Sequence, residues 1–216
     1  MGATSSASVE TAGRESTLFT QVTPNPRFDE VTAGATVYAE QGCDVIIAVG
    51  GGSAIDCAKC IGLLSANPGG LRVLVGVDNV GAPMPPTTCI PTTAGTSADV
   101  SQFAVIADRE IKRKLLIISK AVVPDISLTD PATLTTMDAF LTACTGMDAL
   151  IHAPEAYVSL GHLPLTDNHA LQAMRSGVHR TEVHELAEAA LDDPCVVTNP
   201  RQVNQRDIEV IYEELL

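Results

Sequence analysis

The segment AVGGGSAIDCAK, residues 48–59, constrains the fold more than any other part of the chain. Three glycines and a serine separate an apolar run, DVIIAV (44–49), from a helix-like run, AIDCAKCIGLL (54–64). A short continuous apolar run is typical of a strand that is buried on both faces of a parallel sheet. The order of strand, glycine-rich turn and helix therefore predicts an α/β fold with a turn at the carboxyl end of a strand.

Such a turn has the layout of a phosphate-binding site. Glycines let the backbone approach an anion, and the helix N-terminus offers free N–H groups and the positive end of its dipole. We expect Ser53 to be the helix N-cap and to reach a phosphate oxygen. The segment contains neither the GK[ST] of a P-loop nor the GxGxxG of the dinucleotide fingerprint. A tight turn without a ligand is the alternative, and this stretch alone leaves both interpretations open.

A second donor-rich segment, PTTAGTSADVS (91–101), follows the strand-like run TTCI (87–90). Its hydroxyl groups belong to Thr92, Thr93, Thr96 and Ser97. Turns that follow neighbouring parallel strands lie at the same sheet edge, where open α/β sheets bind ligands. Taken alone, this segment also fits a plain hydrogen-bonded loop. Together the two segments favour a nucleotide, to which Lys114 would add a positive charge.

The remaining pattern predicts an α/β class fold: a partial Rossmann-like parallel sheet domain followed by a truncated all-helical domain. We expect a disordered lead over 1–17, a dinucleotide-binding domain over 18–132 and a helical part over 133–216. A helix at 27–41 precedes the glycine turn. Further strands are expected at 103–107, 115–119 and 125–129, and further helices at 137–159, 165–176, 182–190 and 206–215.

Charge and composition exclude several function classes. The formal net charge is −13, and from Glu182 onward there are nine acidic residues and two arginines, so nucleic acid and anionic membranes are not expected partners. No apolar run approaches the ~18 residues of a membrane span, and the N-terminus lacks the pattern of a secretory signal. We therefore expect a cytoplasmic protein with reduced thiols. Cys57 and Cys60 form a CxxC that is interpreted as two buried thiols, with a redox or metal role as the alternative.

Asp148 and His152 are four residues apart in TGMDALIHAPEAYVS (145–159). On a helix this spacing places a carboxylate and an imidazole on one face, which suits Fe(II) or Zn(II). An ordinary surface pair is the alternative. The other histidines are interpreted as solvated surface residues: His162, His169, His179 and His184.

Four segments in this order resemble the iron-containing (group III) alcohol dehydrogenases: GGGSAIDCAK, PTTAGTSAD, VVPDISLTDPATLT and TGMDALIHAPEAYVS. The tail from residue 186 is similar to the family's C-terminal end. The segments PMPP, GTSADVSQFAVI and ISKAVVPD are similar to the alcohol-dehydrogenase-like regulatory branch. The resemblance covers about 18–175 and 186–216.

The resemblance implies NAD or NADP as cofactor, a divalent metal, and hydride transfer between a small alcohol or aldehyde and nicotinamide. It implies that Gly51, Gly52 and Ser53 hold the dinucleotide pyrophosphate, and that Asp148 and His152 are metal ligands. Further nucleotide contacts are implied at Asp56, Thr92, Thr93, Thr96, Val105 and Lys114.

The chain departs from the family pattern in three ways. The family's first strand–helix–strand unit has no counterpart, so an unpaired strand edge is expected, and with it a homo-oligomer. The two remaining metal histidines belong to a helical stretch after the position of Arg175 that is absent, and residues 176–185 are interpreted as a junction. Pro154 stands where the family has an aliphatic residue, and we expect it to kink the helix near His152.

Three hypotheses follow. The chain is an active metal-dependent alcohol dehydrogenase that obtains further ligands elsewhere, or an inactive nucleotide-binding or regulatory remnant, or an unstable decayed fragment. Under the first hypothesis the two further ligands would come from, for example, a second subunit, because the metal site of this chain alone is expected to be incomplete.

Overall fold

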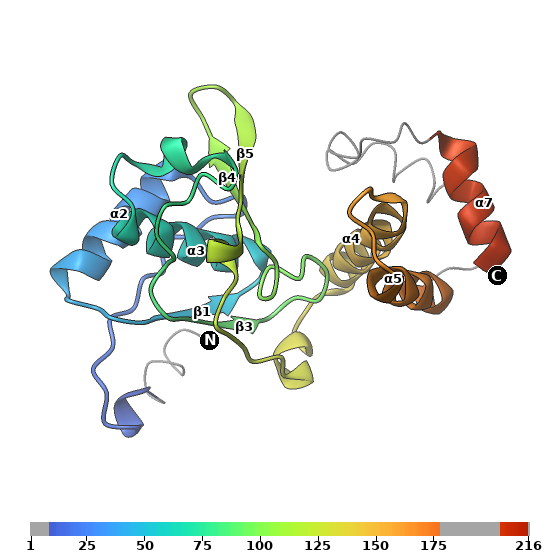
Figure 1. Cartoon of the computed structure of the whole chain (residues 1–216). Helices are drawn as coiled ribbons and strands as arrows, with labels where there is room; N and C mark the ends of the chain where they lie inside the picture. Colours follow the sequence, from blue (N-terminus) through green and yellow to red (C-terminus); the bar gives the residue numbers. More distant parts are fainter. Residues whose placement is uncertain (1–8, 178–203, 216) are drawn as a thin grey trace. The chain divides into compact units, whose positions relative to one another are not determined.

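The computed structural model describes residues 9–177 and 204–215 of the 216-residue chain. The chain divides into two compact units, residues 1–137 and 138–216 (Figure 1). The first unit contains helices and mostly parallel strands, and the described part of the second contains helices. The predicted α/β class, with helices following the sheet domain, is confirmed.

The first unit follows the predicted alternation of strands and helices. Its main elements in chain order are α2 (Phe28–Glu40), β1 (Ile46–Gly50), α3 (Gly52–Ala66), β2 (Gly76–Val77), β3 (Thr87–Pro91), β4 (Phe103–Asp108), β5 (Arg113–Ile118) and β6 (Ile126–Ser127). Short 3-10 helices occupy Leu71–Leu74, Lys120–Val122 and Pro131–Leu134. The Glu30 carboxylate accepts the N–H of Arg27 at 2.9 Å, which fixes the start of α2.

The strands form two separate three-stranded sheets. One has the order β1-β3-β6 and is wholly parallel, so β1 and β3 are neighbours as predicted. The other has the order β2-β5-β4. In it β4 and β5 form an antiparallel hairpin, with Phe103 opposite Ile118 and Asp108 opposite Arg113. A parallel sheet was expected here, but the short turn between the strands allows only hairpin pairing.

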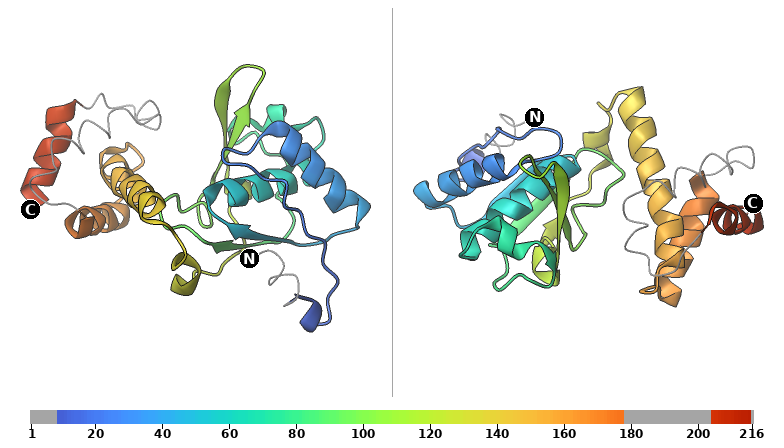
Figure 2. Two further views of the ribbon diagram at one scale, coloured as in Figure 1. Left: turned by 180° about the vertical axis from the view of Figure 1, so that it is seen from behind. Right: turned by 90° about the horizontal axis from the view of Figure 1, so that it is seen from above.

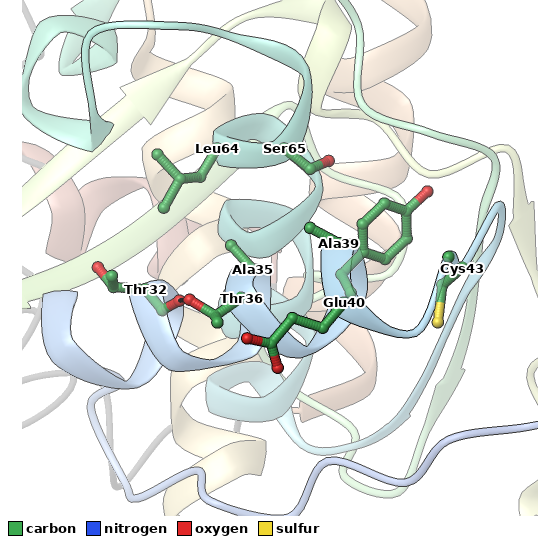
Figure 3. Close-up of a pocket in the computed structure, with 10 residues that line it drawn as sticks. Thr32, Ala35, Thr36, Ala39, Glu40, Cys43, Leu64 and Ser65 are labelled. Atoms are coloured by element: carbon green, nitrogen blue, oxygen red, sulfur yellow. Dashed lines mark hydrogen bonds between the residues drawn. The ribbon is translucent and has the colours of Figure 1, made fainter.

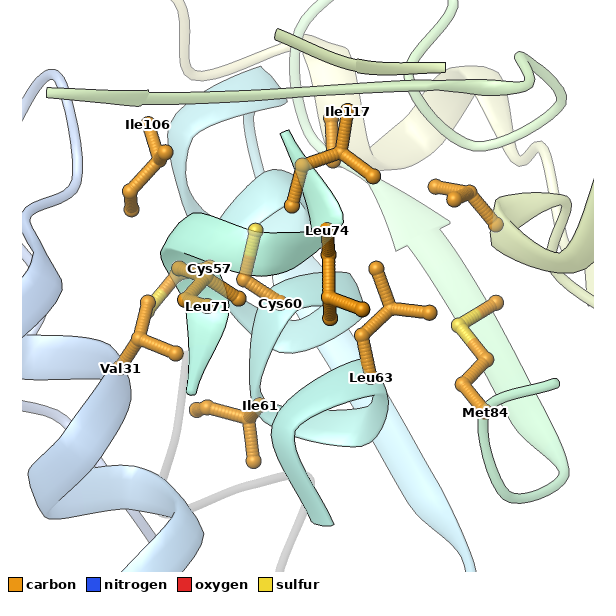
Figure 4. Packing of buried hydrophobic residues seen from close by; sticks show 12 residues of the cluster. Val31, Cys57, Cys60, Ile61, Leu63, Leu71, Leu74, Met84, Ile106 and Ile117 are labelled. Atoms are coloured by element: carbon orange, nitrogen blue, oxygen red, sulfur yellow. The ribbon is translucent and has the colours of Figure 1, made fainter. Parts of the chain in front are cut away.

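Helix α3 is the centre of the first unit. Its residues Cys57, Cys60 and Leu63 are fully buried in a cluster that also contains Ile106 of β4 and Ile117 of β5 (Figure 4). On another side Ile55 and Ala58 pack with Ala48 of β1 and Cys89 of β3. A helix that is apolar on several faces is stable only when buried on all of them. The two sheets and α2 provide that burial (Figure 2).

The second unit is described by its helices α4 (Ala139–Val158), α5 (Pro164–Gly177) and α7 (Gln205–Leu215). Asp138 caps α4, because its carboxylate accepts the N–H of Leu141 at 2.8 Å. The helix assignment continues through Pro154, which is buried, so this proline does not end the helix. The expected helix at 182–190 lies outside the described residues, as does the junction beyond residue 177.

Two helix glycines, Gly62 and Gly146, differ in the space around them, so replacing them with alanine should have opposite effects on stability. A Cβ at Gly62 of α3 would lie 2.9 Å from Met84 Cβ and 3.2 Å from Ile46 Cδ1, whereas a Cβ at Gly146 of α4 would meet nothing within 4 Å. We expect Gly62→Ala to lower the free energy of unfolding by about 1–3 kcal/mol through overpacking. Gly146→Ala should instead raise it by about 0.5–1 kcal/mol, because only the helix propensity changes. Chemical denaturation followed by circular dichroism measures both, and equal shifts of the two midpoints would contradict the packing.

Candidate functional site

The glycine turn joins the end of β1 to the start of α3. Gly51 is the N-cap, with φ −78° and ψ −176°, and its carbonyl accepts the N–H groups of Ala54 and Ile55 at 3.0 and 3.1 Å. The N–H groups of Gly52 and Ser53 precede the first helical acceptor and are therefore available to an anion. The prediction that Ser53 is the N-cap is wrong, because the extended backbone that a cap requires begins at Gly51. The Ser53 Oγ lies in the first turn and accepts the N–H of Asn25 at 3.2 Å.

The threonine loop, residues 92–98, follows β3 and lies against the glycine turn. The N–H of Thr92 donates to the Gly50 carbonyl at 2.9 Å. A Cβ added at Gly51 would lie 3.1 Å from Thr93 Oγ1, and one added at Gly52 would lie 2.7 Å from Thr96 Oγ1. The two donor-rich turns therefore meet at one edge of the parallel sheet, as their positions after neighbouring strands predicted.

Asp56 and Val105 contact each other. The Asp56 carboxylate accepts the Val105 N–H at 3.1 Å, which joins α3 to β4. Burial raises the pKa of Asp56 to about 6, while the Val105 N–H and the Lys59 ammonium act in the opposite direction. Both residues were expected to contact the nucleotide. In the structure each already has a partner within the chain, whereas the N–H groups of Gly52 and Ser53 face no helical acceptor.

Lys114 lies on β5, opposite Ala107 of β4, and its side chain is exposed. It belongs to the hairpin and not to either donor-rich turn. The structure therefore brings together the predicted residues of the two turns, but not this lysine.

The CxxC thiols are structural. Cys57 and Cys60 are both fully buried on α3. Burial raises the pKa of the Cys57 thiol to about 12 and that of Cys60 well above its ordinary value. Since the thiolate is the nucleophile and the metal ligand, these two residues suit neither role. The interpretation as two buried thiols is confirmed.

A surface groove of about 560 Å³ lies between α2 and the C-terminal end of α3, where Thr36, Glu40, Leu64 and Ser65 line it (Figure 3). The glycine turn is at the opposite end of α3. This groove therefore does not belong to the predicted nucleotide site.

The predicted metal ligands lie on α4 in the second unit. Asp148 and His152 are both half-buried. The Asp148 Oδ2 atom is buried and has no hydrogen-bond partner among the described residues. Such an oxygen fits a ligand role, because an unpaired buried carboxylate oxygen is costly. Nevertheless, the described part of the chain contains no group of three or more His, Cys, Asp or Glu side chains that could hold an ion.

The two other described histidines are exposed, as expected. His162 contacts Asp167 near the start of α5, with 2.9 Å between Nδ1 and Oδ2. His169 lies on the exposed part of α5. His179 and His184 lie outside the described residues.

Comparison with known proteins identifies the family. A profile described as "Iron-containing alcohol dehydrogenase" matches residues 3–131, and a second, "Fe-containing alcohol dehydrogenase family, C-terminal", matches residues 142–176. The chain belongs to the iron-containing alcohol dehydrogenase family. The first match begins at residue 3, so the similarity extends further toward the N-terminus than residue 18, where the sequence motifs placed its start.

Several members of this family are similar to the chain. A 1,3-propanediol dehydrogenase of Klebsiella pneumoniae is 42% identical over 164 residues, which are 76% of this chain and 42% of the relative. An NAD-dependent methanol dehydrogenase of Bacillus methanolicus is 40% identical over 167 residues, 77% of this chain and 44% of the relative. The solved structure of an alcohol dehydrogenase from Oenococcus oeni has a TM-score of 0.77 and 33% identity, covering 99% of this chain and 52% of that one. The chain thus spans less than half the length of these two curated relatives.

The second family profile covers most of α4, including Asp148 and His152. Even so, two donors from one helix do not complete a metal centre, which requires several ligands held by supporting contacts. The donor set of the described residues therefore does not fit a resident iron or zinc ion. No helix in the described residues is both long and apolar enough to cross a membrane.

The raised pKa of Asp56 predicts a pH dependence of stability. Because the folded chain binds this proton more tightly than the unfolded chain, the stabilisation is complete below about pH 4 and is lost as the pH rises through about 6. Asp56→Asn keeps an oxygen acceptor for Val105 but removes this titration. We expect the difference in unfolding free energy between wild type and variant to change by at most about 3 kcal/mol between pH 4 and 7. Urea denaturation across this range measures the change, and parallel pH profiles would contradict the assignment.

The incomplete donor set predicts poor metal retention. We expect purified protein to hold much less than one iron or zinc ion per chain after dialysis, as measured by elemental mass spectrometry. Asp148→Ala and His152→Ala should leave this content unchanged, and His162→Ala is the control for adventitious surface binding. One tightly held ion per chain, lost in either α4 variant, would show that further ligands complete the site.

Proposed function

We propose that this chain binds a nicotinamide dinucleotide at the edge of the parallel sheet, where the glycine turn meets the threonine loop. The observation that carries the proposal is the close approach of Thr93 and Thr96 to Gly51 and Gly52 at the start of α3. The pyrophosphate would accept hydrogen bonds from the N–H groups of Gly52 and Ser53. The hydroxyl groups of the threonine loop would add neutral donors on the other side.

Two features of the turn support close approach of a dinucleotide. Neither Gly51 nor Gly52 has a Cβ, and a Cβ at either position would come within about 3 Å of a threonine side chain. The missing side chains therefore let Thr93 and Thr96 pack directly against the turn, which brings the hydroxyl groups of the loop close to the N–H groups at the start of α3. When bound, the nicotinamide ring supplies the hydride chemistry, whereas this chain's own contribution is to hold and orient the pyrophosphate.

The choice between NAD and NADP belongs to this proposal. The relative from Bacillus methanolicus is named an NAD-dependent methanol dehydrogenase, and we infer NAD for this chain on that basis. Asp56, Val105 and Lys114 are assigned supporting roles. Asp56 and Val105 join α3 to β4, and Lys114 adds positive charge on the hairpin.

Dehydrogenase activity on a small alcohol or aldehyde is the second candidate function. It is favoured by the 42% identity to a 1,3-propanediol dehydrogenase and by the Oδ2 of Asp148, which has no hydrogen-bond partner in the part of the chain that the structure describes. A metal-dependent reaction would need donors in addition to Asp148 and His152. The similarity of PMPP and GTSADVSQFAVI to the regulatory branch instead favours nucleotide binding without turnover, and we assign this chain that role.

A homo-oligomer is part of the same proposal. β1 is an edge strand, and Val45 and Ile47 are 46% and 50% exposed. An apolar edge strand without a lysine or proline to protect it is prone to pair with another chain. We also infer a cytoplasmic location.

The test is titration of the purified chain with NADH by calorimetry, after circular dichroism has confirmed a cooperative unfolding transition. We expect measurable binding to wild type and at least about tenfold weaker binding to Gly51→Val and Gly52→Ala, because the new carbon atoms occupy the space beside Thr93 and Thr96. Gly81→Ala is the matched control, since its Cβ would make only an ordinary contact of 3.5 Å with Asn67.

The outcomes separate the hypotheses. If titration of folded wild type with NADH up to millimolar concentration releases or absorbs no heat, nucleotide binding is refuted. Equal affinity in wild type and Gly51→Val would refute this location for the site. Absence of a cooperative transition would instead support the unstable fragment.

A further inference from the structure

Along one edge, the first residues of β4 have no neighbouring strand among the described residues; only near its end does the Ala107 N–H donate to the Pro26 carbonyl, at 2.8 Å, beside a parallel bridge between Arg27 and Ala107. Along its other edge it pairs with β5, and the carbonyl of Gln102, just before it, accepts the N–H of Ser119 at 3.0 Å. Alternate backbone groups of Ser101, Phe103 and Val105 point away from β5. Buried carbonyl and N–H groups need hydrogen-bond partners, so at the start of β4, where no backbone partner is present among the described residues, side chains have to supply them.

Helix α3 supplies those side chains. Lys59 is fully buried, and its Nζ donates to the carbonyls of Ser101 and Phe103 at 2.9 and 3.0 Å and to Ser101 Oγ at 3.3 Å. These contacts use all three donors of the ammonium group. One turn earlier, Asp56 accepts the Val105 N–H. The two α3 side chains thus replace a neighbouring strand along the start of β4.

A buried ammonium group is costly unless it is well paired. Desolvation lowers the pKa of Lys59, and the carboxylates of Asp56 on α3 and of Asp99, just after the threonine loop, oppose this shift. Lys59 therefore lies where α3, β3, β4 and the segment after the threonine loop come together.

The contact at Ser101 connects Lys59 to the threonine loop. The N–H groups of Val100 and Ser101 both donate to the Ser97 carbonyl at 3.1 Å. Ser97 itself has a left-handed backbone with φ 50°, which a non-glycine residue adopts only when its surroundings enforce it. The neighbouring Thr96 side chain lies beside Gly52. A short chain of backbone hydrogen bonds therefore runs from the Lys59 ammonium to the residues that face the glycine turn.

We propose that Lys59 is a positioning residue of the nucleotide site, because its ammonium group fixes Ser101 and Phe103 and so holds the threonine loop against the glycine turn. This inference rests on the proposed nucleotide binding. Lys59 does not touch the nucleotide; it acts through the backbone of residues 97–101. The alternative is a lysine that stabilises the fold without affecting the site.

The test compares NADH affinity in Lys59→Met with that in Leu63→Ala. Methionine keeps the length of the side chain and removes all three donors. Leu63 is fully buried on the same helix, one turn later, and its truncation destabilises the core without touching the segment before β4. We expect Lys59→Met to bind NADH about tenfold more weakly than wild type and Leu63→Ala to bind within about twofold of wild type, both at a temperature where they are folded.

Hydrogen exchange gives a second reading that does not require the nucleotide. In Lys59→Met the amides of Val100 and Ser101 should exchange at least about tenfold faster, whereas those of β1 should keep their protection. In Leu63→Ala the ratio of the exchange rates of the Val100 and Ser101 amides to those of the β1 amides should equal the ratio in wild type. If Lys59→Met does not fold, Lys59→Gln retains an amide donor and should show a smaller change in the same direction in both measurements.

Each outcome decides the inference. Wild-type binding together with unchanged affinity in Lys59→Met overturns the positioning role and leaves the proposed function intact. Equal losses of affinity in Lys59→Met and Leu63→Ala also overturn it, since a general loss of stability then explains both. Faster exchange at Val100 and Ser101 with no NADH binding in wild type refutes the proposed function, and the role in the site with it, while leaving the structural link between Lys59 and the loop.

Discussion

The first unit depends on the contact between α3 and the start of β4, where side chains of the helix bind the backbone of the strand. The strands form two sheets that are not continuous with one another, and α3 packs with residues of both. Apolar side chains on several sides of α3 fill the space, but they cannot satisfy the carbonyls of Ser101 and Phe103 or the N–H of Val105. Lys59 and Asp56 do so at 2.9–3.1 Å. Two charged residues in a mostly apolar helix therefore join the sheets and set the position of the loop that follows β3.

The same helix carries the glycine turn at its first residue. Because α3 is held between the sheets, its N-terminus is fixed relative to the threonine loop by packing at one end and by Lys59 in its middle. The contacts that hold α3 in the core would therefore also hold a ligand site at this turn in place. The metal half-site has less support, because Asp148 and His152 lie on one helix of the other unit, and the buried Oδ2 of Asp148 has no hydrogen-bond partner among the described residues.

The sequence predicted features that local pattern determines. Apolar runs located β1 and β3, helical spacing located α2 and α4, and the order of turns after parallel strands placed Gly51 near Thr93. It did not predict features that depend on distant partners. Lys59 reads as an ordinary helix residue, since its acceptors are 42 and 44 residues away in sequence. Ser53 has the residue type of an N-cap, but the extended backbone occurs at Gly51, where no side chain obstructs the approach of Thr93. The hairpin of β4 and β5 was missed because apolar runs do not encode strand direction, although the connection between the two runs is too short for a parallel crossover and could have indicated the hairpin.

The strongly acidic chain is compatible with binding an anionic pyrophosphate, because net charge and local field differ. With a net charge of −13, long-range attraction of a phosphate is absent, and at physiological salt charges more than about 8 Å apart are largely screened. A pyrophosphate placed at the turn would contact backbone N–H groups at the positive end of α3 and the hydroxyl groups of Thr93 and Thr96. The nearby buried ammonium of Lys59 is offset by Asp56 and Asp99. Recognition of a dinucleotide at the proposed site would therefore depend on the placement of neutral donors, and the contacts that hold the threonine loop would matter more than the number of charges around it.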